Sequence, residues 1–170
     1  MKKITCVAVF LLCLLSCSVC FCNNDTREIT GGFGGVVFGL SPEEVSEICG
    51  DPIDTRDESR PGFTVPILTH CIYKNGIEVY FEEYNEGLLA RRIVCSNPKF
   101  KTVSGICVGM NIKRAKNIVS RIRINKNKGD GGKIPINMRW AQLLGDGCEM
   151  IFLMNDKGNI RSMFVDVFED

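Results

Sequence analysis

Residues 77–95, IEVYFEEYNEGLLARRIVC, and residues 148–166, CEMIFLMNDKGNIRSMFVD, align without a gap at a constant offset of 71. Upstream of them, residues 36–45, VVFGLSPEEV, match residues 106–115, ICVGMNIKRA, at an offset of 70. Two matched blocks in the same order indicate a duplicated supersecondary unit of about 70 residues. The duplication predicts an architecture and leaves the chemistry open.

Local patterns predict that each copy is a short strand, a helix and three further strands. In the first copy, Ser41 and Glu44 can form a capping box, Pro42 suits the first helical position, and Gly50 ends the helix. We expect short strands at 36–38 and 106–108, a polar loop at 51–62, a longer second helix from Asn111 to about Ile122, and meander strands in 63–95 and 134–167. The predicted fold class is α+β, with two tandem helix-plus-three-stranded antiparallel meander repeats at 36–96 and 105–168.

Alternation of apolar and polar residues predicts which side chains of the strands form the core. Ile77, Val79 and Phe81 alternate with Glu78, Tyr80 and Glu82, which indicates one buried face and one wet face. With the aligned second copy, the residues expected to be largely buried are Ile77, Val79, Phe81, Met150, Phe152, Ile160 and Phe164.

The N-terminus has the layout of a secretory signal peptide. Lys2 and Lys3 precede an apolar run from Ile4 to Leu15, which is short for a membrane span. We interpret residues 1–22 as the signal peptide and residues 23–35, which are polar and then glycine-rich, as a flexible tether. An uncleaved anchor is the alternative, because apolar character continues to Cys22.

The residues Leu14-Leu15-Ser16-Cys17 resemble the lipobox of bacterial lipoproteins. The resemblance implies cleavage before Cys17 and lipidation of its sulfur. Such a lipid would anchor the exported chain in a membrane of the cell envelope, on the periplasmic side or the surface, because each buried CH₂ contributes about 0.8 kcal/mol. Cleavage after Cys20 or Cys22 and secretion without a lipid is the alternative.

Cysteines beyond the signal are candidates for disulfides, because export allows them to form. Five are present: Cys49, Cys71, Cys95, Cys107 and Cys148. Cys49 ends the first predicted helix, and Cys71 lies in the strand expected to pass beneath it, so this pair is our first choice. Cys95 with Cys107 is the second.

Charge is sorted along the chain. Residues 23–90 carry 13 acidic and 4 basic side chains, whereas residues 91–145 carry 13 basic and 1 acidic. The two segments could neutralise each other within the fold, or the basic one could present a face for an anionic lipid or an acidic protein. That anionic-partner face would comprise Lys113, Arg114, Lys116, Arg121, Arg123, Lys126, Lys128 and Lys133. Nucleic acid is not an expected partner, because an exported chain rarely meets it and aromatic residues are not interleaved with the cations.

Catalytic and metal-binding motifs do not emerge from the sequence. His70 is the only histidine, and no serine or cysteine motif accompanies it. The acidic run from Asp54 to Glu58 lacks the glycine and the final glutamate of a calcium loop. We therefore expect a protein that is not an enzyme and has no cofactor or metal.

The helical opening of the first copy, GLSPEEV at 39–45 followed by ICGDP at 48–52, resembles that of small outer-membrane-assembly lipoproteins of the SmpA/OmlA (BamE-like) family. The matching positions are Gly39, Ser41, Val45, Gly50 and Pro52. The second copy departs from this pattern, because it lacks the G-x-P after its helix. As a tandem pair, the two copies are also similar to the β-lactamase-inhibitor-protein-like architecture. The first resemblance implies a non-enzymatic envelope lipoprotein that binds a protein partner or supports an assembly. The second implies an inhibitor or ligand-binding module directed at an extracytoplasmic enzyme.

Overall fold

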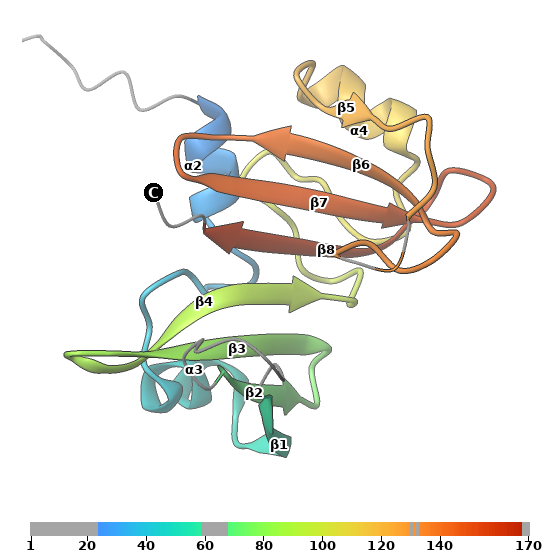
Figure 1. Cartoon of the computed structure of the whole chain (residues 1–170). Coiled ribbons are helices and arrows are strands. Elements are labelled where there is room, and N and C mark those ends of the chain that lie inside the picture. The colour runs from blue at the N-terminus through green and yellow to red at the C-terminus, as the bar shows by residue number, and fades with distance from the viewer. Residues whose placement is uncertain (1–23, 59–67, 130, 132, 168–170) are drawn as a thin grey trace, which may run out of the picture.

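The computed structural model describes residues 24–58, 68–129, 131 and 133–167. Within this part of the chain, eight strands form one continuous antiparallel sheet in the order β1-β2-β3-β4-β8-β7-β6-β5 (Figure 1). The pairing of β4 with β8 at its centre joins the last strands of the two halves of the chain. The strands are β1 (Pro52–Glu58), β2 (Leu68–Tyr73), β3 (Ile77–Tyr84), β4 (Gly87–Cys95), β5 (Arg123–Ile124), β6 (Arg139–Leu144), β7 (Cys148–Met154) and β8 (Ile160–Val167).

Three short helices are present among the described residues: α2 (Asn24–Thr30), α3 (Pro42–Cys49) and α4 (Ile112–Ile118). The predicted capping box at the start of α3 is confirmed, since Glu44 N donates to Ser41 Oγ at 3.3 Å and Ser41 N donates to Glu44 Oε2 at 2.8 Å. The prediction that the second helix runs to about Ile122 is wrong. α4 ends at Ile118, because the chain must turn there for Ile122 to enter the core and for β5 to pair with β6.

The helices all pack on one face of the sheet, which we call the inner face. Ile29 of α2, Val45 of α3 and Ala115 of α4 are buried in the same core as the inward side chains of the strands. All seven residues predicted to be buried are buried. Phe164, however, lies on the opposite or outer face, where it packs with Ile134 and Ile151.

The outer position of Phe164 follows from a β-bulge in each half. Arg91 is the extra residue where β4 pairs with β3, and Arg161 is the extra residue where β8 pairs with β7. An extra residue shifts the alternation of side chains by one position. Met163 therefore takes the inward place in β8 that Ile93 has in β4, and the expected match of Ile93 with Phe164 is wrong.

Edge strands account for a second difference from the sequence analysis. Residues 51–62 were expected to form a polar loop, but Pro52–Glu58 form β1, which pairs with β2 at one edge of the sheet. Backbone pairing at an edge does not require apolar side chains, and charged residues are common there. The short strands expected at 36–38 and 106–108 are single bridges instead, between Phe33 and Val36 and between Lys101 and Cys107.

The segment expected to be a flexible tether is part of the folded core where the structure describes it. Residues 24–30 form α2, which contacts β6 and β7, and the following turn closes with hydrogen bonds between Phe33 and Val36. Ile29 and Phe33 are fully buried. The glycines beside Phe33 therefore serve a tight turn here.

Glu28 fastens α2 to the connection between the two halves. Glu28 is 2% exposed, and its carboxylate accepts hydrogen bonds from the Thr102 hydroxyl and, at 2.8 Å, from Ser104 N. Replacing Glu28 by Ala should lower the free energy of unfolding by about 1.5–3 kcal/mol, because buried donors would lose a charged acceptor. Urea denaturation would measure this loss, and Glu28→Gln, which keeps an acceptor, should lose less. Equal stability of Glu28→Ala and the unmodified chain would contradict the described packing of α2.

The same pair of backbone hydrogen bonds lies just before α3 in one half and just before α4 in the other. Gly39 N donates to Ala90 O at 3.0 Å, and Ala90 N donates to Leu40 O at 2.8 Å. At positions 70 residues later, Gly109 N donates to Ile160 O at 2.8 Å, and Ile160 N donates to Met110 O at 2.9 Å. Gly39 and Gly109 have φ of 80° and 89°, a conformation in which glycine alone is unstrained.

Candidate functional site

A row of charged and aromatic side chains crosses the outer face of the sheet. Strand pairing places its members directly opposite one another on six neighbouring strands, from β1 through β4 and β8 to β7. We call this set the outer row: Arg56, His70, Tyr80, Arg92, Asp166 and Glu149. Among the described elements, no helix covers this face, because α2, α3 and α4 all pack on the inner face.

The first part of the outer row is aromatic. The rings of His70 and Tyr80 are stacked, with centroids 4.0 Å apart and an angle of 8° between their planes. The Arg92 guanidinium lies 5.6 Å from the Tyr80 ring centroid and 5.8 Å from that of Phe164. These distances allow cation–π attraction to both rings. Arg92 therefore links the aromatic part of the row to the apolar cluster around Phe164.

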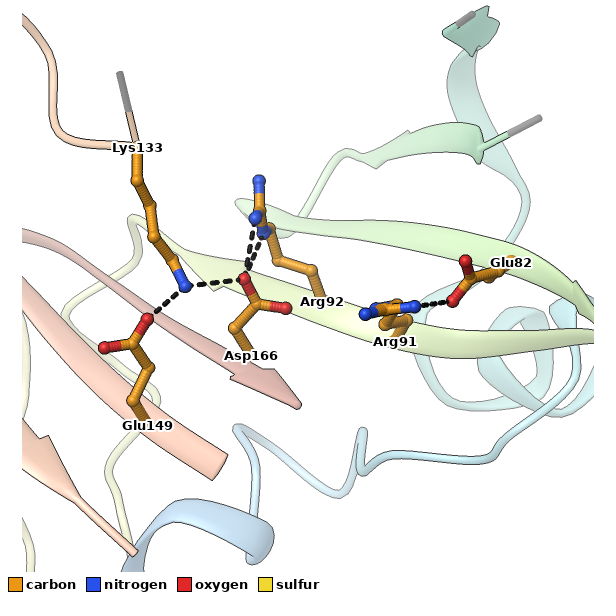
Figure 2. A network of polar contacts seen from close by, with 6 residues as sticks. All are labelled: Glu82, Arg91, Arg92, Lys133, Glu149 and Asp166. Carbon is orange, nitrogen blue, oxygen red and sulfur yellow. Dashed lines mark hydrogen bonds and ion pairs between the residues drawn. The ribbon is translucent and has the colours of Figure 1, made fainter. Parts of the chain in front are cut away.

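The second part of the outer row is a compact ion network (Figure 2). Arg92 Nε and Nη2 donate to Asp166 Oδ2 at 3.1 and 2.6 Å, and Lys133 Nζ lies 3.0 Å from the same oxygen. Lys133 also pairs with Glu149. The side chains of Asp166 and Glu149 are only 8% and 7% exposed, so each carboxylate needs a nearby cation.

A separate ion pair in Figure 2 lies within the β3–β4 hairpin. Arg91, the bulge residue of β4, pairs with Glu82, whose carboxylate also accepts a hydrogen bond from the Tyr84 hydroxyl at 2.9 Å. Glu82 is 3% exposed, so this pair neutralises a third buried carboxylate on the sheet.

The histidine of the outer row, His70, contacts a carboxylate and a tyrosine ring. His70 Nε2 lies 3.1 Å from Glu78 Oε2, with Tyr80 against its ring, and neither contact activates a nucleophile. Within the described ranges, no cluster of three or more His, Cys, Asp and Glu side chains is arranged to hold a metal ion.

The residues of the predicted anionic-partner face do not form one unit. Lys133 belongs to the ion network, where it is neutralised by Glu149 and Asp166, which lie outside the acidic segment 23–90. Lys113, Arg114 and Lys116 are exposed on α4. Arg121, Arg123, Lys126 and Lys128 are exposed in β5 and the segments beside it.

Sequence reasoning missed the outer row because its members are far apart along the chain. The alternation in β3 placed Glu78 and Tyr80 on a wet face but could not give their neighbours on other strands. Glu149 and Asp166 offered one signal, since each is the single carboxylate of its strand and is flanked by apolar residues. Such residues are rarely buried without a counter-charge.

The five cysteines in the described part of the chain form no disulfide. Neither expected pairing, Cys49 with Cys71 or Cys95 with Cys107, is present in the structure. Cys71 is buried, with its sulfur 3.7 Å from the Thr55 hydroxyl, and Cys95 is fully buried beside Asn97 O.

Burial should make the thiols slow to react. It raises the pKa of Cys49 and of Cys95, although a hydrogen bond to the side chain of Asn75 partly offsets the effect at Cys49 and one to the backbone of Asn97 does so at Cys95. Because the thiolate is the reactive species, alkylation of the folded chain at neutral pH should be slow and should accelerate as the pH rises toward these raised pKa values. Peptide mapping after alkylation in denaturant without reductant should find all five cysteines modified. A disulfide-linked peptide of Cys49 and Cys71 would instead support the pairing expected from the sequence.

The predicted lipidation site Cys17 and signal peptide lie outside the described residues. Among the helices of the described part, none is long and apolar enough to cross a membrane.

Comparisons of the chain with known protein families, with curated proteins and with solved structures found no match.

Proposed function

We propose that this chain is a non-enzymatic binding module of the cell envelope that receives a protein partner on the outer face of its sheet. The observation that carries the proposal is the outer row, in which Tyr80, Arg92 and Asp166 are held by one another across the seam between the two halves. Side chains that are already ordered lose less conformational entropy when a partner binds.

The chemistry of the row indicates what the partner presents. Arg92 and Lys133 neutralise Asp166 and Glu149, so the centre of the face has little net charge. Tyr80, Arg92 and Trp140 are partly exposed, and tyrosine, arginine and tryptophan are the residue types that most often dominate binding energy at interfaces. A partner protein with an apolar and aromatic contact surface suits this face.

We also propose that the two halves derive from a duplicated unit. The matched hydrogen bonds at Gly39 and Gly109, the bulges at Arg91 and Arg161 and the symmetric strand order support this origin. Their common offset is 70, one less than the gap-free alignment of the hairpins. Each unit then contains a helix and four strands, of which β1 and β5 are the edge strands.

The sequence remains the basis for placing this module in the envelope. We propose export by the signal peptide and anchoring through a lipid on Cys17, in agreement with the lipobox resemblance. Replacing Cys17 by Ala should release the protein from the membrane fraction or leave an unprocessed precursor. An intact mass that shows a mature chain beginning at Phe21 or Asn23 without lipid would contradict lipidation.

A site-specific crosslinking experiment tests the proposed binding face. A photoreactive amino acid at Tyr80 should yield one discrete crosslinked protein in cells, whereas the same residue at Glu47, on the helix side, should not yield that product. The crosslink should weaken when Arg92 is replaced by Ala in the same chain. An integral outer-membrane protein as the product would support the assembly role, and a soluble hydrolase would support the inhibitor role. Identical products from both positions, or none from Tyr80, would contradict the proposal.

A further inference from the structure

The corresponding helices of the two halves carry opposite charges. At the offset of 70 that relates their N-caps Ser41 and Asn111, Glu43 of α3 corresponds to Lys113 of α4, and Glu44 corresponds to Arg114. All four side chains are exposed. The next residue in each helix is apolar and buried, Val45 in α3 and Ala115 in α4. The inner side of the molecule thus carries an acidic helix at one end and a basic helix at the other (Figure 1).

The acidic helix borders a hollow. A depression of about 490 Å³ is lined by Pro42, Glu43, Ser46, Glu47 and Asp51. Within the described residues, Glu43, Glu47 and Asp51 take part in no ion pair. The hollow is therefore a shallow, open acidic surface that could receive basic side chains.

The positive charges in the first turn of α4 do not stabilise this helix. Lys113 and Arg114 lie in its first turn, where the helix dipole favours anions, so their charges destabilise the isolated helix. Within the described residues they form no ion pair either. Each helix also exposes one apolar residue at the matching position, Ile48 and Ile118, both 45% exposed.

We infer that two copies of this chain associate, with the basic face of α4 from one copy seated on the acidic hollow beside α3 of the other. Charge complementarity and the matched exposed isoleucines select a second copy as the occupant. Because both helices lie on the inner side, at opposite ends of the sheet, a two-fold axis between two facing copies brings each α3 to the α4 of the other copy. Both contacts then form in one closed pair.

The contact should be weak and sensitive to salt. Helices of eight and seven residues offer little area, and small interfaces are typical of transient association. The Debye length, over which charges act on each other, falls from about 10 Å at 0.1 M salt to about 3 Å at 1 M. High salt should therefore separate the copies.

Charge reversal tests the inference by sedimentation velocity of the full chain in a non-ionic detergent. Glu43→Lys with Glu47→Lys makes both helices basic, and Lys113→Glu with Lys116→Glu makes both acidic. Each variant alone should self-associate at least about tenfold more weakly than the unmodified chain at 0.1 M salt. An equimolar mixture of the two variants should associate again, and so should one chain that carries all four substitutions. Glu44 is left unchanged because it forms the capping box of α3.

Controls separate the inference from unfolding and from other causes of association. Glu83→Lys with Glu86→Lys changes the charge by the same amount at the exposed β3–β4 turn and should leave association unchanged. Restored association in the mixture also shows that both variants are folded. Association that ignores salt and charge reversal, or a mixture that stays unassociated, would overturn the inference. It would equally be overturned if the unmodified chain stayed monomeric at 0.1 M salt, whether or not α4 bound vesicles of anionic phospholipid.

Discussion

The variant Phe33→Ala should lose about 3–5 kcal/mol of the free energy of unfolding, because a fully buried aromatic side chain would leave a cavity in the core. A loss of this size could exceed half the stability of a small domain. Urea denaturation followed by the fluorescence of Trp140, the only tryptophan, would measure it.

The size of this effect distinguishes the structure from the sequence-based expectation. If residues 23–35 were a flexible tether, Phe33→Ala would change the stability by no more than about 0.5 kcal/mol. Ile53→Ala is the matched control, because Ile53 is 65% exposed in β1 and its truncation should have little effect. Similar small losses for both variants would show that Phe33 is not part of the core.

The variant Asp166→Ala should lose about 2–4 kcal/mol of the free energy of unfolding. It leaves the partly buried cations of Arg92 and Lys133 without their shared carboxylate. The expected loss is at the lower part of the range for buried pairs, since the side chains of Arg92 and Lys133 are 29% and 33% exposed. The same denaturation experiment measures it.

An exposed ion pair on the same sheet provides the control. Asp54 pairs with Arg56 in β1, with side chains 38% and 64% exposed, so Asp54→Ala should cost no more than about 1 kcal/mol. A combined Arg92→Leu and Asp166→Leu variant should recover much of the loss, because replacing a buried pair by apolar groups avoids an unpaired charge. Equal effects of Asp166→Ala and Asp54→Ala would show that the network contributes no more than a surface pair.

Local patterns predicted the elements whose stability depends on neighbouring residues. The capping box of Ser41 and Glu44 placed the start of α3 correctly. Alternation in Ile77, Val79 and Phe81 identified both β3 and its inward side. In each case the information lies within a few residues, since capping and strand amphipathicity are short-range properties.

The incorrect predictions concern elements whose structure depends on tertiary contacts. β1 is polar and gains its place by backbone pairing with β2, so its side chains carry no periodic signal. α2 is a seven-residue helix that is marginal alone and is held by the burial of Ile29 and by the bonds of Glu28. The bulge at Arg161 changed the face of Phe164, because it depends on the pairing of β8 with β7.

By itself, the sequence predicted antiparallel strands, and the described residues form one antiparallel sheet of eight strands. It also determined the charge of each segment, because charge is a property of composition. Only the tertiary structure decided which charges meet. Strand pairing brought Arg92 to Asp166, 74 positions apart in the sequence, while the packing of α3 and α4 on the inner face left their opposite charges exposed. Pairing across a sheet depends on register between distant strands, which no local pattern specifies.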